Sequence, residues 1–290
     1  MSKRIVVCGG SGFVGKALKA LLQSKGYQVV VVSRTPKGHE VGWEGLTSTL
    51  EGAFAVVNLS GRPISCIFTE ENKKEILESR VQSTNQVANA LTHCTNMPEK
   101  WVNASAVGFF GDRDEELLMA DSEPGKDFVS DVCVKWEDAC LKSSVEIDKV
   151  VLRFGVVFGE GGALEPLVKV TKLFLGGHIG TGDQWMSWIT IHDLVRMILW
   201  SIENDCPPVM NACTPNPVRN RDLMAWLRGQ LHRPWSPPVP AFVMKIVGKV
   251  VGPDASLLLV STRAIPNSEL AFHFDFPELS SLKLSDIETS

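Results

Sequence analysis

The chain has 290 residues, of which 44% are hydrophobic and 21% charged, and its formal net charge is -4. This composition is typical of a globular protein with a large core, and it excludes a disordered chain. Lys and Arg are spread along the sequence, so the basic stripe that a nucleic-acid partner requires is absent. The first apolar run, of about five residues, is too short for a signal sequence or membrane span. We therefore expect a cytoplasmic protein without a membrane partner.

The cysteines follow no metal-binding or disulfide pattern. The sequence has seven of them, with no Cys-x-x-Cys pair and no His-rich partner segment. We therefore expect reduced, mostly packed thiols and no metal.

The first half of the chain alternates short β-branched runs with helical stretches. Near-continuous apolar runs are typical of strands covered on both faces, and they predict strands at 5–8, 29–33, 55–59, 101–105 and 150–154. The intervening helices are predicted at 12–24, 70–94 and 129–141. This alternation predicts an α/β protein with a Rossmann-type doubly wound parallel sheet.

Beyond residue 159 the pattern changes, because glycine-rich breaks interrupt it. We predict a helix at 164–174, a strand at 185–189, a helix at 193–202 and a strand at 209–212. The proline-rich tail carries two short helical runs, at 241–251 and 254–259. The predicted domains are a Rossmann-type domain at 1–233, with substrate-side insertions from about 159, and a small C-terminal lobe at 234–290.

A glycine-rich run follows the first predicted strand at once and opens a helix. In this context one glycine permits a tight turn, the next a close approach of the backbone to a pyrophosphate, and the last close packing of helix on sheet. The helix N-terminus supplies N–H groups and positive dipole charge to phosphates. The alternative is an ordinary glycine-rich turn. We expect a dinucleotide to contact Gly9, Ser11, Gly12, Phe13, Val14 and Gly15.

The second predicted strand ends in Ser33 and Arg34. An acidic residue in this region would bind the ribose 2′-hydroxyl of NAD, and none occurs before Glu40. The Arg34 guanidinium instead suits the 2′-phosphate of NADP, with the Ser33 hydroxyl as a second donor. We expect NADP(H), although a solvated loop arginine is the alternative.

The third predicted strand ends in a turn at the carboxyl edge of the sheet, where ligands of open α/β folds bind. Its backbone is expected to border the adenosine half of the cofactor, although a plain turn explains the pattern equally well. The residues concerned are Asn58, Leu59, Ser60 and Gly61.

Nearly the whole chain resembles the extended and atypical short-chain dehydrogenase/reductases, specifically an NAD(P)-dependent, sugar-nucleotide-epimerase-like family with its own C-terminal lobe. The matching segments are 9–15, 57–61, 103–111, 135–137, 153–159, 184–189, 211–217 and 263–266, with Phe272 and Phe274. The resemblance implies that Arg80 replaces a cofactor-side asparagine and reaches a phosphate, while Glu75 holds Arg80 or contacts the cofactor. An ion pair on the helix surface is the alternative for Glu75 and Arg80.

Active members of this superfamily use a Tyr-x-x-x-Lys pair on the helix after the fourth strand, with a serine or threonine at that strand's end. Ser105 matches the serine, but the only tyrosine in the sequence is Tyr27, on the expected adenosine side. If Glu137 is matched with the glutamate that commonly follows the pair in extended members, Val129 takes the position of the tyrosine and Cys133 that of the lysine. If Lys135 is taken as the lysine, Asp131 takes the position of the tyrosine. Neither register restores a phenol.

Ser105 and Lys135 remain the catalytic candidates, and other side chains are alternative proton donors or nucleophiles. Asp131 with Lys135 is a candidate acid/base pair or a solvated ion pair. Cys133 is a nucleophile or a packed thiol. His192 is a candidate proton donor in the substrate cleft. The alternative is that this segment only caps the following helix, through Asp193.

Two functions from different classes stay open. One is an NADP-dependent oxidoreductase or epimerase-like enzyme, with Ser105 and an unconventional proton donor, acting on a small polar substrate such as a nucleotide sugar. The other is a regulatory or scaffold protein that holds NADP(H) without hydride chemistry. The chain is expected to be a monomer or a homodimer through the helix at 70–94. The predicted strand at 185–189 has an aromatic face with Trp185, Met186 and Trp188. This face is expected either to form a substrate pocket with Phe109 and Phe110 or to pack in the core between the lobes.

Overall fold

The computed structural model describes residues 2–240 and 259–288. Its central sheet has six parallel strands in the order β10 (Val209–Ala212), β6 (Asp148–Phe154), β4 (Lys100–Ala106), β3 (Ala55–Asn58), β1 (Arg4–Cys8) and β2 (Gln28–Val32). The strand order reverses between β1 and β3, which creates a crevice at their carboxyl ends. The doubly wound α/β prediction is confirmed. The strand predicted at 209–212 is present, and the structure places it at one edge of this sheet.

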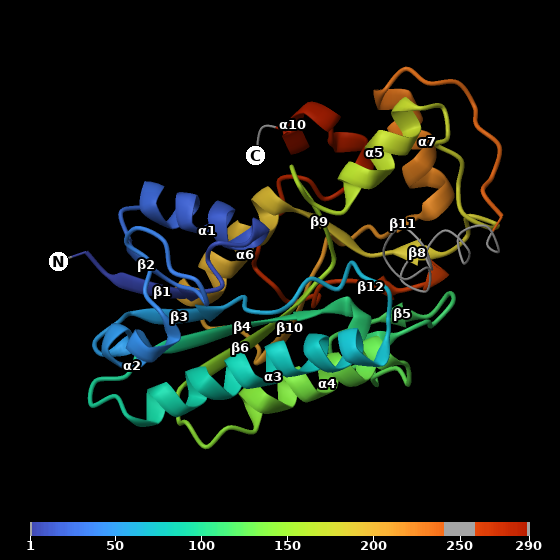
Figure 1. The fold of residues 1–290 in the computed structure, drawn as a ribbon. Coiled ribbons are helices and arrows are strands. Elements are labelled where there is room, and N and C mark those ends of the chain that lie inside the picture. The colour runs from blue at the N-terminus through green and yellow to red at the C-terminus, as the bar shows by residue number, and fades with distance from the viewer. Residues whose placement is uncertain (1, 241–258, 289–290) are drawn as a thin grey trace.

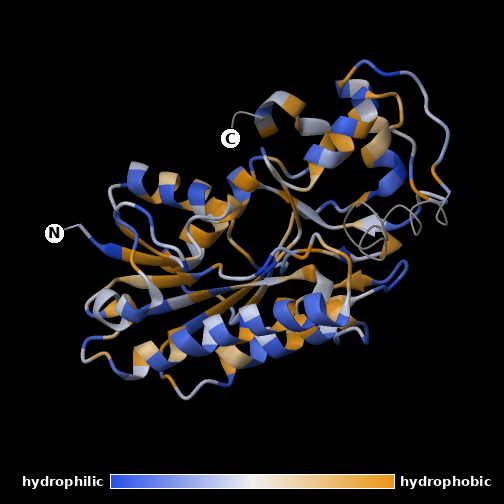
Figure 2. Ribbon diagram, in the orientation of Figure 1, coloured by the Kyte–Doolittle hydropathy of each residue, from blue (hydrophilic) through white to orange (hydrophobic). Residues whose placement is uncertain are grey.

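Helices cover both faces of the sheet (Figure 1). On one face lie α1 (Phe13–Ser24) and α6 (Ile191–Glu203), and on the other lie α2 (Leu46–Leu50), α3 (Glu70–Thr92) and α4 (Phe128–Leu141). Alternate residues of β1 enter two separate apolar clusters, Ile5 and Val7 in one, Val6 and Cys8 in the other. Burial on both faces explains the near-continuous apolar runs, and Figure 2 shows the strands correspondingly orange.

The region beyond residue 155 differs in detail from the prediction. The strand expected at 185–189 is two strands, because β8 (Trp185–Met186) pairs antiparallel with β11 (Val218–Arg219), whereas β9 (Trp188–Thr190) pairs parallel with β7 (Val156–Phe158). Helix α5 (Leu164–Lys172) ends two residues before the predicted end. Helix α7 (Asn220–Gln230) was not predicted, although Leu223 and Leu227 bury one face of it.

The described part of the tail, 259–288, contacts both halves of the molecule. Strand β12 (Arg263–Ala264) pairs with β5 (Leu117–Leu118), and Phe272 and Phe274 pack against the cluster under α6. Helix α10 (Leu284–Glu288) follows a 3-10 turn at Leu279–Ser281 and reaches the α5 and α7 cluster through Leu284 and Ile287. The domain boundary at 233 and 234 stays a prediction, and the helices predicted at 241–251 and 254–259 lie, apart from Leu259, outside the described residues.

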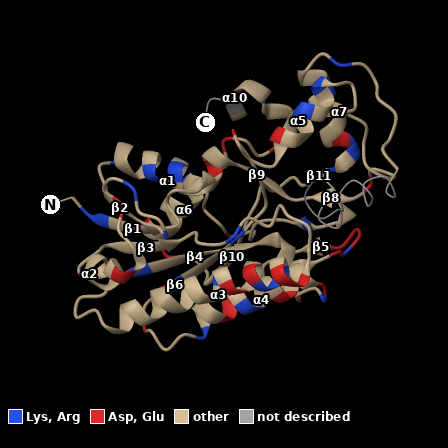
Figure 3. Cartoon of the chain, in the orientation of Figure 1, with Lys and Arg blue, Asp and Glu red and all other residues tan. Residues whose placement is uncertain are grey.

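Charged residues of both signs lie on α4 and on the N-terminal half of α3 (Figure 3). They form ion pairs one turn apart on these helices, such as Lys142 with Asp138 at 2.7 Å. None of the helices in residues 2–240 and 259–288 has both the length and the apolar character needed to cross a membrane.

Candidate functional site

A first cavity, of about 680 Å³, lies at the carboxyl ends of β1, β2 and β3. Each strand contributes the residues that directly follow it, so three separate turns meet at the crevice where the strand order reverses. This is the position where open α/β sheets bind ligands. The residues predicted from the sequence that line it are Gly9, Ser11, Gly12, Ser33, Arg34, Leu59, Ser60, Gly61 and Glu75.

The turn after β1 has no room for side chains at two of its glycines. Gly9 has φ +79°, in the left-handed region, and a Cβ there would lie 3.0 Å from the Leu59 backbone. A Cβ on Gly15 would lie 2.5 Å from the Gly10 Cα, so α1 packs directly on the turn. Glycine is therefore required at both positions for the backbone to form this cradle.

Helix α1 points its N-terminus at the first cavity. Gly12 is the N-cap and offers no side-chain acceptor to the first-turn N–H groups, so these groups and the helix dipole favour an anion in the cavity. Phe13 and Val14 do not line the cavity, because both pack against the apolar cluster under α1 and α6. Their predicted cofactor contacts stay predictions.

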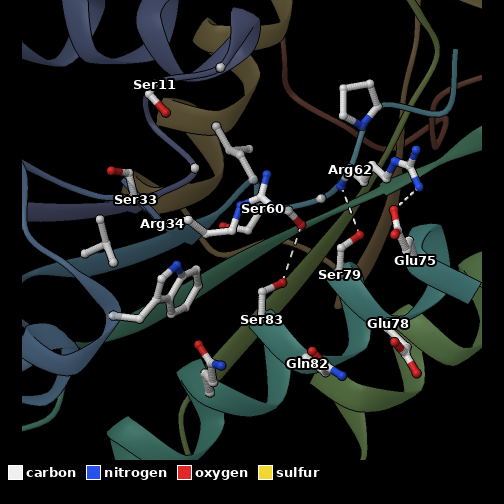
Figure 4. A pocket seen from close by; sticks show the side chains of 18 residues that line it. Ser11, Ser33, Arg34, Ser60, Arg62, Glu75, Glu78, Ser79, Gln82 and Ser83 are labelled. Carbon is white, nitrogen blue, oxygen red and sulfur yellow. Dashed lines mark hydrogen bonds and ion pairs between the residues drawn. The ribbon is translucent and has the colours of Figure 1, made fainter. Parts of the chain in front are cut away.

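Arg34 faces the first cavity without a partner (Figure 4). Its side chain makes no hydrogen bond or ion pair to any other described residue. Ser33 is buried, and its hydroxyl donates to Glu40 Oε2 at 2.8 Å. A free guanidinium at the end of β2 is therefore available to an anionic ligand, whereas the Ser33 hydroxyl would first have to turn from Glu40.

Asn58 holds two strands and a helix together beneath the cavity. It is fully buried, and its Nδ2 donates to Asn103 Oδ1 at 2.8 Å and to Thr84 Oγ1 at 3.1 Å. Its Oδ1 accepts the N–H of Ser60 at 3.2 Å. Asn58 is not among the lining residues, so its contacts indicate that it shapes the turn that borders the cavity.

The two cofactor-side residues implied on α3 have separate partners. Glu75 forms an ion pair with Arg62, not with Arg80. Arg80 donates to the carbonyl oxygens of Arg62 and Ile76, each at 3.0 Å, and burial lowers its pKa. The guanidinium lies under the backbone of Gly61 and outside the cavity lining, and its phosphate contact stays a prediction.

Sequence reasoning missed several residues of the first cavity. Arg62 directly follows the predicted turn, and its charge was the available signal. The others come from the end of β2, the turn at Trp43–Gly45, the loop after β3 and the face of α3 toward the cavity, and no motif marked them in the sequence. These residues are Val32, Trp43, Pro63, Glu78, Ser79, Gln82, Ser83 and Gln86.

A second cavity, of about 540 Å³, lies beyond the carboxyl ends of β4 and β6. Val107 and Gly108 come from the 3-10 turn at Val107–Phe110, and Trp185 and Met186 come from β8. The expected aromatic wall is therefore correct for β8 alone. Trp188 is buried and stacks on Phe158 at 5.0 Å, and Phe109 and Phe110 are buried beside Arg153.

Helix α4 places the residues of the two possible registers differently. Val129 lines the second cavity, whereas Asp131 and Lys135 form a half-exposed ion pair at 2.7 Å elsewhere on the helix. Of these positions only Val129 lines the cavity, since Cys133 is buried in an apolar cluster. Tyr27 lies just before β2, at the amino end of the sheet, where its hydroxyl donates to Glu203 at 2.6 Å.

Ser105 belongs to a buried charge network. Its Oγ donates to Glu137 Oε1 at 2.6 Å, and Arg153 makes two hydrogen bonds to the same carboxylate, at 2.8 and 2.7 Å. Arg153 also donates to the Ala120 carbonyl at 2.8 Å. Ser105 does not line the second cavity, so its contacts point to a structural role and its catalytic role stays a prediction.

Cys133 is a packed thiol. It is buried, and desolvation raises its pKa to about 12. At pH 8 only about one thiol in 10⁴ would be ionised. We expect iodoacetamide at pH 8 to leave Cys133 unmodified in the folded protein and to modify it in urea, as read by peptide mass spectrometry. The half-buried Cys66 serves as the reference site, and modification of Cys133 as fast as Cys66 would contradict the expectation.

His192 contacts the tail and lines neither cavity. Its Nε2 lies 2.8 Å from Asp275 Oδ2. Burial raises the Asp275 pKa, but this hydrogen bond and the charges of Arg196, His192 and His273 together leave the pKa lowered. Asp193 is not the cap of α6, because Thr190 is its N-cap residue. The Asp193 carboxylate instead accepts hydrogen bonds from the backbone N–H groups of Asp275 and Phe276. This group anchors the tail on α6.

Comparison with known proteins identifies relatives that are named as epimerase-family proteins. The model of the NAD dependent epimerase/dehydratase family matches residues 5–213. The chain is 34% identical over 286 residues to mouse epimerase family protein SDR39U1, covering 95% of this chain and 97% of the relative. An Arabidopsis thaliana homolog, named as chloroplastic, is 32% identical over 294 residues and covers 94% of this chain and 83% of the relative. A crystal structure of human epimerase family protein SDR39U1 (isoform2) with NADPH has a TM-score of 0.90 at 33% identity and covers 99% of both chains.

Proposed function

The chain belongs to the NAD dependent epimerase/dehydratase family, and from this premise we propose that it is an NADP(H)-dependent oxidoreductase-like protein. The observation that carries the proposal is the Arg34 guanidinium at the first cavity, which has no hydrogen-bond or ion-pair partner among residues 2–240 and 259–288. A guanidinium fork matches the 2′-phosphate that distinguishes NADP from NAD. The human relative crystallised with NADPH supports the same cofactor.

The residues of the first cavity fit a dinucleotide. The glycine cradle lets a pyrophosphate approach the backbone, and the N-terminus of α1 stabilises its charge. When bound, the cofactor supplies hydride chemistry. The second cavity is the proposed site of a small-molecule substrate, since it lies at the same edge of the sheet, beyond β4 and β6.

We further propose that any chemistry here proceeds without the usual tyrosine. Val129 lines the second cavity on the helix where active relatives carry a phenol, and an isopropyl group exchanges no proton. The contacts of Ser105 and Lys135 support structural roles for both. These observations also favour a second candidate function, a regulatory protein that holds NADP(H) without turnover.

The test is a fluorescence titration of the purified full chain with NADPH, followed by incubation with a panel of carbonyl compounds. NADPH binding with oxidation of NADPH by at least one carbonyl compound supports the enzyme. Binding without oxidation across the panel supports the regulatory candidate, and failure of NADPH to bind contradicts both.

The remaining assignments are also proposals. A reducing compartment such as the cytoplasm is supported by the seven free cysteines, although the Arabidopsis relative is named as chloroplastic. Monomer and homodimer both stay open.

A further inference from the structure

We infer that the second cavity binds a flat, uncharged, apolar carbonyl compound, such as an aryl ketone, with Lys73 donating a hydrogen bond to the carbonyl oxygen. The inference rests on the proposed function, because a nicotinamide-dependent oxidoreductase acts on a carbonyl or the corresponding alcohol. It departs from the nucleotide sugar considered from the sequence.

The walls of the second cavity are mainly aromatic and aliphatic. Phe68 and Phe128 meet edge to face with ring centroids 5.1 Å apart, and both line the cavity. Trp185 and Met186 contribute from β8, and Val129 from α4. Surfaces of this kind favour flat rings, and a volume of about 540 Å³ accommodates a fused two-ring compound.

The hydroxyl groups of the lining already have partners within the protein. Ser187 Oγ lies 2.9 Å from both the Thr262 and the Ala264 carbonyl oxygens and accepts the Ala264 N–H at 2.7 Å. Thr262 Oγ1 donates to the Gly111 carbonyl at 3.1 Å. The protons of these two hydroxyl groups are therefore not available to a sugar, and sugar hydroxyl groups buried here without partners would be costly. The described lining therefore disfavours a polyhydroxylated ligand.

Lys73 supplies the polar contact that an apolar carbonyl compound needs. Its Nζ lies 5.6 Å from the centroid of the Phe128 ring and 2.9 Å from Glu70 Oε1, and the Glu70 side chain is 92% exposed. An ammonium has three N–H donors, so hydrogen-bonding capacity remains for a ligand. The pair with Glu70 is also weak, because it is solvated.

The charges of the described lining balance. Lys73 contributes one positive charge, and Asp127 contributes one negative charge. The Asp127 carboxylate accepts the N–H and the hydroxyl of Ser130, so it caps α4 and offers a ligand little. An anionic ligand would therefore meet both an attractive and a repulsive charge, which favours an uncharged one.

The experiment is isothermal titration calorimetry on the full chain saturated with NADP⁺. The probes are 2-acetonaphthone, 2-ethylnaphthalene, which has the same rings without the carbonyl, and uridine diphosphate glucose. We expect 2-acetonaphthone to bind about fivefold to tenfold more tightly than 2-ethylnaphthalene, the effect of one charge-assisted hydrogen bond at a partly solvated site. Uridine diphosphate glucose is expected neither to bind nor to displace it.

Lys73→Met keeps an apolar stem and removes the ammonium, and it is expected to abolish the difference between the two naphthalenes. Lys74→Met is the matched control, because Lys74 is the next residue of α3, has a 73% exposed side chain and does not line the cavity. The control should leave the difference intact. Unchanged NADP⁺ affinity and melting temperature in both variants show that folding is preserved.

Three results would overturn the inference: tighter binding of uridine diphosphate glucose than of 2-acetonaphthone, no binding of 2-acetonaphthone, or equal discrimination by Lys73→Met and the unchanged chain. In each case NADP⁺ binding still stands, so the proposed function is judged separately. If NADP⁺ itself fails to bind, the proposed function and the inference that rests on it both fall.

Discussion

Replacing Arg34 with alanine is expected to weaken NADPH binding about tenfold to a hundredfold while changing NADH binding by less than about twofold. Hydrogen bonds to a charged partner contribute about 1.5–3 kcal/mol, which corresponds to this range of affinity. Only NADPH carries the 2′-phosphate, so only its affinity depends on the guanidinium. Fluorescence titrations of the two reduced cofactors against the same variant measure the ratio directly.

Two further variants show whether charge or geometry is responsible. Arg34→Lys keeps the charge but loses the planar fork, so an intermediate loss of NADPH affinity is expected. Lys25→Ala removes a positive charge at the C-terminal end of α1, away from the glycine turn, and should leave both affinities unchanged. Equal weakening of NADPH and NADH by Arg34→Ala would contradict the assignment of the 2′-phosphate to Arg34.

Replacing Glu137 with alanine is expected to lower the free energy of unfolding by about 3–5 kcal/mol, the range for breaking a buried ion pair from one side. The side chains of Arg153 and Glu137 are only 4% and 5% exposed, and the pair has two hydrogen bonds. Without the carboxylate, the guanidinium would remain buried and uncompensated, and the Ser105 hydroxyl would lose its acceptor. Urea denaturation at pH 7 measures the change.

The matched control is Asp131→Ala on the same helix. Its ion pair with Lys135 is about half exposed, so the expected loss is below about 0.5 kcal/mol. Ser105→Ala is expected to cost about 1.5 kcal/mol and to leave NADPH binding unchanged. A loss below about 1 kcal/mol for Glu137→Ala would contradict the buried network, and Ser105→Ala with normal stability but no turnover would restore a catalytic role for Ser105.

Much of the fold follows from local patterns. The apolar run at 5–8 and the glycine turn after it predict a strand, a turn and a helix within a few residues, and β1 and α1 match those bounds closely. The segment at 185–189 was harder, because its alternation fits one strand. Two partners, β11 and β7, divide it at Ser187, whose hydroxyl contacts residues about 75 positions later in the chain.

The candidate site likewise combines features that local patterns predict with features that depend on distant segments. The resemblance implies that Glu75 holds Arg80 or contacts the cofactor. The turn after β3 brings Arg62 to Glu75 instead of Arg80, and the cofactor contact stays a prediction. Arg80 instead donates a hydrogen bond to the Arg62 carbonyl oxygen and so stabilises that turn. Both outcomes depend on where the loop between β3 and α3 runs, and no periodicity encodes that path.

The doubly wound sheet, the glycine turn after β1 and the arginine at the end of β2 could be predicted from local sequence, because each depends on residues adjacent in the chain. The sequence also determined that Tyr27 is the only phenol. Two features depend on the packing of distant segments: Val129, rather than Asp131, lines the second cavity, and Ser105 donates to Glu137, 32 positions away. The reason is physical: a helix can present any of its faces to a cavity, and the packing of α4 on α3 and the sheet selects one of them.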